Sequence, residues 1–490
     1  HLSAELWHFG HRVCTVPSRV IRVSPDASDV IRESILALQA AQNVAPNFPA
    51  EVEAAAIAAA REVTLPTLDL TDVPFFTIDP PTSMDLDQAM FLERTPTGFR
   101  VHYAIADVAA FVKPGGVLDA ELARRGETLY GADSKIPLHP KVLSEDAASL
   151  LPGVVRPAIV WQLDLDAAGE LQATQVRRAA VKSTAKLAYE QVQASLDAGE
   201  QTYALLREIG QLRQQAEAAR GAVSLPMPEQ NVAIDHDEWS LVLRQPLPVE
   251  LWNAQISLLT GMAAAQMMIN ARVGVLRTLP AAQPRALDRL RRTAKALGVS
   301  WPAAMSYPDF VRSLDPDNPR HAAMVVACTT LLRGAGYVCF NGEVPAERTH
   351  AAIAAPYAHV TAPLRRLVDR YALEVCVSID AGQPVAQWVL DAFDDLPAIM
   401  QASGRRARSY ERAIVDLVEA QMLSGRVGER FEGVILEIDP EDPNKGVVQI
   451  ADPAVESVVT SDAPLPVGEQ VQVRLVSADP DARTVKFARV

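Results

Sequence analysis

The sequence predicts an α+β fold that ends in a small all-β barrel. Two stretches of alternating apolar and polar residues, at 88–112 and 158–182, are typical of β-hairpins. Long segments with helical periodicity lie between residues 186 and 424. From about residue 425 the pattern changes to short alternating strands separated by turn residues, which indicates a five-stranded barrel of the OB type.

Three domains are predicted along the 490 residues. Residues 1–62 form a small helical region with two helices within 28–62, a possible remnant of a helix-turn-helix module. Residues 63–424 begin with a proline-rich linker and hold both hairpins and the long helices, and residues 425–490 form the barrel. Helical segments of the middle domain are predicted at 186–219, 249–273, 284–297, 319–334, 364–380 and 399–424.

Composition indicates an ordinary globular protein. The net charge of −14 argues only weakly against nucleic-acid binding, because phosphate binding needs a local basic surface. The four cysteines form no CxxC pair, which favours a reducing, cytoplasmic location. The apolar segment 251–273 carries several amide side chains and is expected to be a buried core helix rather than a membrane span.

The stretch TIDPPTSMDLDQAM places three aspartates, Asp79, Asp85 and Asp87, between two apolar runs. In an extended segment Asp85 and Asp87 point to the same face, about 7 Å apart, and a loop can return Asp79 to them. Converging carboxylates repel one another unless a cation binds between them, and oxygen ligands suit Mg²⁺ or Mn²⁺. Such ions support hydrolysis of a phosphodiester. From spacing alone, ordinary aspartates of a surface loop explain the pattern equally well.

The same stretch resembles the signature of the ribonuclease II (RNB) family of 3′→5′ exoribonucleases. Later blocks resemble the family in the same order, among them RRGETLYGADSKIPLHPKVLSEDAASLLPGVVRPA, YAHVTAPLRRLVDRY and SGRRARSYER. The resemblance covers roughly residues 45–490. It implies an RNB-type catalytic domain at 63–424 and an RNA-binding OB domain at 425–490.

The resemblance implies roles for the acidic segment. Asp79, Asp85 and Asp87 match the family aspartates that hold the metal ions and the attacking water. Gln88 matches a fourth aspartate, and here the sequence departs from the family. An amide oxygen can ligate a cation but brings no charge, so we expect weaker metal binding. Arg365 matches the arginine that the family places against the scissile phosphate, where a guanidinium stabilises developing charge.

Other positions are implied to contact RNA. Tyr130 matches the aromatic residue that flanks the terminal base, and Leu225 is the candidate for the second wall of that clamp. Glu411 matches a glutamate near the 3′ end of the substrate, or pairs with neighbouring arginines instead. Arg405 belongs to a basic helix that lines the route to the site or is simply solvated. Arg366 is a further candidate for RNA contact, although an ion pair with Asp369 is the simpler expectation.

These features predict a processive, divalent-metal exoribonuclease that acts on single-stranded RNA as a cytoplasmic monomer. Two alternatives stay open: a catalytically impaired RNA-binding protein, suggested by Gln88, and a metal phosphodiesterase acting on DNA or small nucleotides. Family members often carry two cold-shock barrels before the catalytic domain. Because the resemblance leaves no length for them here, we also expect duplexes with a 3′ overhang to approach the site closely.

Overall fold

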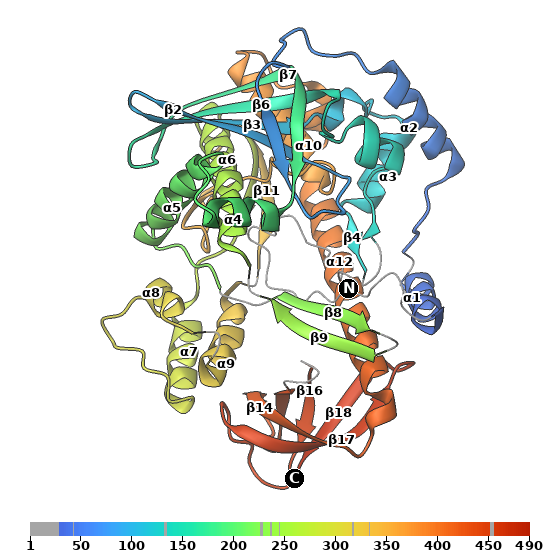
Figure 1. Cartoon of the computed structure of the whole chain (residues 1–490), viewed down its shortest axis with the longest axis vertical. Coiled ribbons are helices and arrows are strands. Elements are labelled where there is room, and N and C mark those ends of the chain that lie inside the picture. Colours follow the sequence, from blue (N-terminus) through green and yellow to red (C-terminus); the bar gives the residue numbers. More distant parts are fainter. Residues whose placement is uncertain are drawn as a thin grey trace.

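The computed structural model describes residues 29–490 apart from residues 43, 132–134, 226–228, 236–237, 245, 316–317, 333 and 451–454. In this part of the chain two closed five-stranded barrels lie at opposite ends of the molecule, with helices around and between them (Figure 1). The structure therefore has the α+β architecture, the C-terminal barrel and the N-terminal helices that the sequence predicts.

The first barrel carries the acidic segment between two of its strands. Its strands are β1 (Phe75–Ile78), β2 (Gln88–Thr95), β3 (Gly98–Ala106), β6 (Val155–Asp166) and β7 (Leu171–Leu187). They pair antiparallel in the order β1-β2-β3-β6-β7, and parallel pairing of β1 with β7 closes the barrel. Tyr103 on β3 and Trp161 on β6 are opposite each other and fully buried, and they are the largest fully buried side chains of the barrel.

Helices pack around this barrel. They are α2 (Ala50–Glu62), α3 (Val117–Arg125), α4 (Tyr189–Asp197), α5 (Ala204–Ala219), α6 (Pro248–Ala271), α10 (Leu367–Asp380) and α11 (Gln387–Asp391). The predicted core helix is α6, which is apolar on nearly every side and buried along most of its length. A Cβ atom at Gly261 would overlap the ring of Tyr357, and Ala358 N–H donates to the Gly261 carbonyl (3.1 Å). Glycine thus lets segment 357–366 cross α6 closely, which fixes where that segment enters the site.

A separate helical unit lies beside the second barrel (Figure 1). It consists of α7 (Pro284–Ala296), α8 (Tyr307–Arg312) and α9 (Pro319–Cys328). Its own apolar core includes Trp301 stacked on Phe310 with ring centroids 4.0 Å apart. Short two-stranded sheets lie outside the two barrels. They pair β4 (Leu129–Tyr130) with β5 (Lys135–Ile136), β8 (Glu229–Asp235) with β9 (Glu238–Arg244), β10 (Val273–Thr278) with β11 (Gly336–Asn341), and β12 (Thr349–His350) with β13 (Ala355–Pro356).

The second barrel is formed by the C-terminal residues. Its strands are β14 (Arg430–Ile438), β15 (Lys445–Ile450), β16 (Glu456–Thr460), β17 (Gln470–Asp479) and β18 (Thr484–Arg489), in the order β14-β15-β16-β18-β17. The long helix α12 (Leu396–Leu423) runs from the first domain down to this barrel (Figure 1). The N-terminal helix α1 (Asp29–Ala41) packs on α12, where Gln39 Nε2 donates to the Tyr410 hydroxyl (3.0 Å).

The structure corrects the predicted elements in three places. Segment 186–219 is two helices, because the chain turns at 198–203, where Gly199 has a φ of 82°. The helix predicted at 319–334 ends at Cys328 and continues as a 3₁₀ turn. The hairpin β8–β9 and the two-stranded sheet of β10 and β11, which are far apart in the sequence, were not predicted. Residues 1–28 of the expected helix-turn-helix remnant lie outside the described residues.

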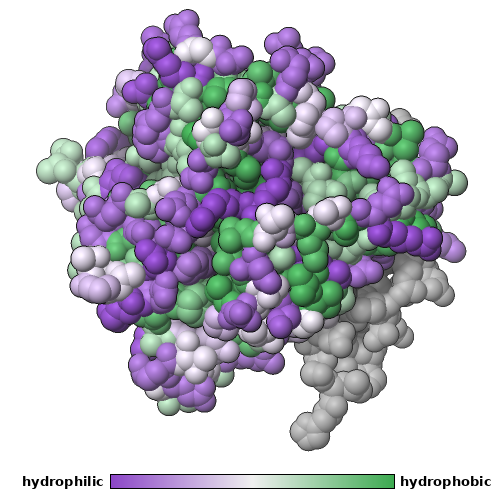
Figure 2. Space-filling view, turned by 90° about the horizontal axis from the view of Figure 1, so that it is seen from above, coloured by the Kyte–Doolittle hydropathy of each residue, from purple (hydrophilic) through white to green (hydrophobic). Residues whose placement is uncertain are grey.

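Hydrophilic and hydrophobic residues are interspersed on the face of the molecule seen from above in Figure 2. Within the described residues, the structure contains no helix with the length and apolar character needed to span a bilayer. The segment around 251–273, whose amide side chains argued against a membrane span, is a buried helix as expected.

Candidate active site

The acidic segment links the end of β1 to the start of β2. Asp79 directly follows β1, and its N–H donates to the Leu187 carbonyl at the end of β7 (3.0 Å). Leu86 is fully buried, and its N–H donates to the Ser149 hydroxyl (2.9 Å). Alternation in an extended segment would turn Asp85 and Asp87 away from the face of Leu86, and this common face stays a prediction.

Asp87 joins this segment to the block at 361–366, which is distant in sequence. Leu364 N–H donates to Asp87 Oδ1 (2.7 Å), and Arg365 Nε lies 3.9 Å from Asp87 Oδ2. Asp87 is buried, and the Arg365 side chain is 15% exposed. A guanidinium therefore stands beside the predicted metal ligands while part of it stays accessible to a bound molecule.

Burial and neighbouring charges change the pKa values of Asp79 and Asp87. Burial, followed by repulsion from Asp85 and Asp87, raises the pKa of the Asp79 carboxyl well above its usual range. Burial, partly offset by Arg365 and the Leu364 N–H, raises the pKa of Asp87 to about 7. These carboxylates are costly to keep charged without a cation, and their hard oxygen atoms match the preference of Mg²⁺ or Mn²⁺.

The geometry of the acids is nevertheless not that of a completed metal cage. Among the residues that the structure describes, no group of three or more Asp, Glu, His or Cys side chains is arranged to hold a metal ion. The donor chemistry fits a divalent cation held by Asp79 and Asp87, but Asp85 is already engaged elsewhere.

Asp85 is paired with a lysine. Lys135 Nζ, on β5, lies 2.5 Å from Asp85 Oδ1 and 3.2 Å from Glu145 Oε1. Burial alone would lower the pKa of Lys135, but the combined effect of Asp85 and the other acidic groups around it, Glu145 among them, raises the pKa. An ammonium group thus occupies one side of the acidic cluster.

Gln88 is held by the protein on both sides of its amide. Its Nε2 donates to the Thr361 carbonyl (2.5 Å), and its Oε1 accepts a hydrogen bond from the Tyr103 hydroxyl (2.6 Å). The Thr361 carbonyl can only accept, which fixes the orientation of the amide. The Tyr103 hydroxyl also lies 2.8 Å from Ser257 Oγ, so Gln88 belongs to a buried hydrogen-bond chain.

The block carrying Arg365 is rigidly held. Asp369 is fully buried, pairs with Arg366 through two hydrogen bonds (2.8 and 2.9 Å) and accepts one from Ala362 N–H (2.7 Å). The structure thus places Arg366 in the expected ion pair. Arg365 C=O accepts from Thr128 N–H (3.0 Å), which ties the block to the strand that carries Tyr130.

His139 also holds the block at 361–366 in place. It is buried, and its Nδ1 donates to the Leu364 carbonyl (3.0 Å). Burial lowers the pKa of His139 to about 4, so the ring is neutral at neutral pH. The Leu364 peptide is therefore held by His139 at its carbonyl and by Asp87 at its N–H.

The two residues predicted to clamp the terminal base lie on different structural units. Tyr130 lies on β4, whereas Leu225 packs against the apolar core of the α7–α9 unit. Glu411 is buried on α12, and Arg405 is exposed on the same helix. The clamp and the contacts of Glu411 and Arg405 with RNA stay predictions.

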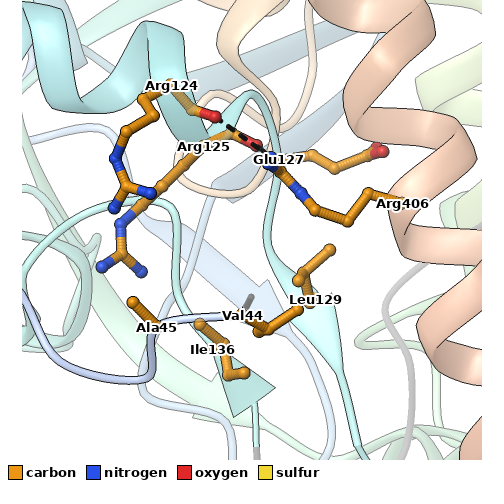
Figure 3. Close-up of a pocket in the computed structure, with 8 residues that line it drawn as sticks. All are labelled: Val44, Ala45, Arg124, Arg125, Glu127, Leu129, Ile136 and Arg406. Atoms are coloured by element: carbon orange, nitrogen blue, oxygen red, sulfur yellow. Dashed lines mark hydrogen bonds between the residues drawn. The ribbon is translucent and has the colours of Figure 1, made fainter. Parts of the chain in front are cut away.

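A small pocket lies between the end of α3, the β4–β5 strands and α12 (Figure 3). Arg406 reaches from α12 to the backbone carbonyls of Arg124 and Arg125, and the hydrogen bond to Arg124 is 3.1 Å long. Leu129 and Ile136 form an apolar side of the pocket. These hydrogen bonds fasten α12 to the end of α3, shortly before the strand that carries Tyr130.

Sequence reasoning missed Lys135, His139 and Tyr103. Lys135 and His139 stand in the stretch SKIPLHP, where no spacing marks them as partners of an acid 50 residues earlier or of the Leu364 carbonyl. Tyr103 shares one face of its strand with the apolar residues Val101 and Ile105, and this pattern indicates a core residue. These side chains reach the site through contacts between segments that are far apart in the sequence.

Comparison with known proteins matches two regions of the chain. The RNB domain family matches residues 67–376, and the RNase II-type exonuclease C-terminal S1 domain matches residues 429–490. The exosome complex exonuclease RRP44 homolog A of Arabidopsis thaliana is 30% identical over 319 residues, which cover 61% of this chain and 34% of that protein. The chain spans about a third to a half of the length of the curated relatives it matches.

Solved structures share the fold. The apo form of Mycoplasma genitalium RNase R has a TM-score of 0.82 at 19% identity and covers 94% of this chain and 78% of its own. The same protein has been solved with ribose-methylated single-stranded RNA and with double-stranded RNA. Yeast Ssd1, described as a pseudonuclease, has a TM-score of 0.69 at 14% identity and covers 90% of this chain and 57% of its own.

Proposed function

Because the chain belongs to the RNB family, we propose that it is a 3′→5′ exoribonuclease that hydrolyses single-stranded RNA to nucleoside 5′-monophosphates with the help of Mg²⁺ or Mn²⁺. The observation that carries the proposal is the junction at Asp87, where one carboxylate accepts the Leu364 N–H and lies beside Arg365. A metal-binding acid and a phosphate-binding guanidinium are thus held against each other by rigid backbone.

Each group has a role in this proposal. A bound divalent ion supplies a Lewis acid that polarises the phosphodiester and an activated water. Asp79 and Asp87 hold that ion, and Arg365 binds the phosphate oxygens, on which negative charge grows in the transition state. Arg366, Asp369 and His139 keep Arg365 in place without touching the substrate.

Binding of the strand is assigned to the surrounding elements. Tyr130 stacks on a base near the 3′ end, and the C-terminal barrel grips the strand farther away. Mycoplasma genitalium RNase R, which shares the fold, has been solved with both single- and double-stranded RNA. On that basis we propose that this chain also accepts duplexes with a 3′ overhang.

A 5′-labelled RNA strand tests the proposal. In Mg²⁺ we expect progressive shortening from the 3′ end with release of nucleoside 5′-monophosphates, and a 2′-deoxy strand of the same sequence should be degraded much more slowly. Equal hydrolysis of both strands would indicate a general phosphodiesterase instead. Internal cleavage products would contradict an exonuclease.

A second candidate function is RNA binding without turnover. Gln88 carries this alternative, because it replaces a family acid and its amide is already bound by Tyr103 and Thr361. Ssd1 is a precedent for a pseudonuclease on this fold. RNA that is bound but not shortened in Mg²⁺ or Mn²⁺ would favour this function, and hydrolysis by Gln88→Asp alone would trace the loss to that position.

A further inference from the structure

Lys135 is the only lysine that forms an ion pair with one of the three predicted metal ligands among the described residues. Its Nζ lies 2.5 Å from Asp85 Oδ1 and 3.2 Å from Glu145 Oε1, and its side chain is 21% exposed. Lys186, the other lysine near the acids, donates instead to the Pro81 carbonyl (2.7 Å). A close, partly desolvated pair of this kind is held more firmly than an exposed one.

The position of the fourth family acid offers no compensating charge. Gln88 is neutral, and both ends of its amide are bound within the protein. If a second divalent ion entered at Asp85, it would have to displace the Lys135 ammonium. It would also find an amide where a carboxylate would be needed to balance its charge.

The site is therefore divided into two halves. Asp87 accepts the Leu364 N–H (2.7 Å) and lies 3.9 Å from Arg365 Nε. Asp85 and Glu145 share Lys135. Among the described residues no lysine is paired with Asp87, whereas a lysine ammonium is already paired with Asp85.

We propose that Lys135 is a built-in cation that takes the place of a second divalent ion, so that this chain binds one divalent ion, between Asp79 and Asp87. Gln88 complements this arrangement because a fourth negative charge would favour a second ion over the lysine. What the single ion does to RNA rests on the proposed function, but the number of ions bound does not.

Mn²⁺ binding in the absence of RNA tests the proposal. Equilibrium dialysis, with free Mn²⁺ measured by electron paramagnetic resonance, should give one tight ion per chain. Removing the lysine charge in Lys135→Met should allow a second ion to bind or tighten Mn²⁺ binding at least about tenfold, since a positive charge near the ion is lost. The double variant Lys135→Met/Gln88→Asp should bind two ions.

Lys141→Met is the matched control. Lys141 lies 4.0 Å from the other oxygen of Glu145 but is 72% exposed, so its removal should leave the number of ions and the affinity unchanged within about twofold. Lys135→Gln serves as a second neutral variant if Lys135→Met does not fold, and Lys135→Arg should keep a single ion.

Two tight ions in the unchanged chain would overturn the proposal, and so would identical Mn²⁺ binding by the parent, Lys135→Met and Lys135→Gln. Failure of the proposed function gives a different result, because a chain that binds one ion but leaves RNA intact would contradict the exonuclease and support the role of Lys135.

Discussion

Replacing Asp87 by asparagine should make the metal-free protein more stable at high pH. Burial raises the pKa of this carboxyl from its ordinary value of 3.8 to about 7. The folded state therefore holds a proton that the unfolded chain releases, so the carboxyl destabilises the fold as pH rises from about 4 to 7. At about 1.4 kcal/mol per pKa unit, the full cost above pH 7 is roughly 4 kcal/mol.

Asparagine does not titrate and can still accept the Leu364 N–H, so Asp87→Asn removes this cost. The gain relative to the parent should be about 2 to 3 kcal/mol larger at pH 8 than at pH 5, because most of the penalty develops between these values. Urea unfolding in EDTA at both pH values measures this difference.

Asp72→Asn, at an exposed aspartate, controls for the loss of one negative charge. A gain for Asp87→Asn that does not depend on pH would refute the reasoning, because it would mean that Asp87 titrates alike in the folded and unfolded chains.

Three further predictions concern the neighbouring groups. Arg365→Ala should lower the single-turnover rate at least about a hundredfold with little change in RNA binding, and Arg365→Lys should recover only part of it; an unchanged rate would remove Arg365 from catalysis. Asp369→Ala should lower the free energy of unfolding, measured in urea, by about 3–5 kcal/mol because Arg366 is left buried without its partner. The double variant Arg366→Met/Asp369→Leu should recover most of this free energy. A loss below about 1 kcal/mol for Asp369→Ala would contradict a structural role for the pair. A duplex with a short 3′ overhang should be digested up to the paired region, and stalling well before it would count against close approach of structured RNA.

Local patterns in the sequence predict much of this fold. Alternation marks β2, β3, β6 and β7 and the C-terminal barrel, and helical periodicity marks α6, α7 and α12. Closure of the first barrel could not be predicted, because it depends on the four-residue strand β1 pairing with β7, about a hundred residues later in the chain. The turn at Gly199 was missed because a single glycine interrupts an otherwise helical pattern.

The sequence likewise predicts only part of the candidate site. The common face of Asp85 and Asp87 is a prediction from alternation, and Leu86 between them is fully buried. The approach of Arg365 to Asp87 was expected only from the family resemblance, because 278 positions separate them. Lys135 could not be found from the sequence, since its pairing depends on where β5 lies relative to the acidic segment 50 residues earlier.

The most direct test of the account is single-turnover hydrolysis of the 3′-terminal phosphodiester of an RNA strand at increasing Mg²⁺ or Mn²⁺ concentration, for the parent and for Asp87→Asn. The parent should release a nucleoside 5′-monophosphate at a rate that rises from background and saturates as the ion concentration increases. Asp87→Asn should bind RNA equally well but react at least about a thousandfold more slowly. Hydrolysis that persists in EDTA, or that Asp87→Asn carries out at the parental rate, would contradict it.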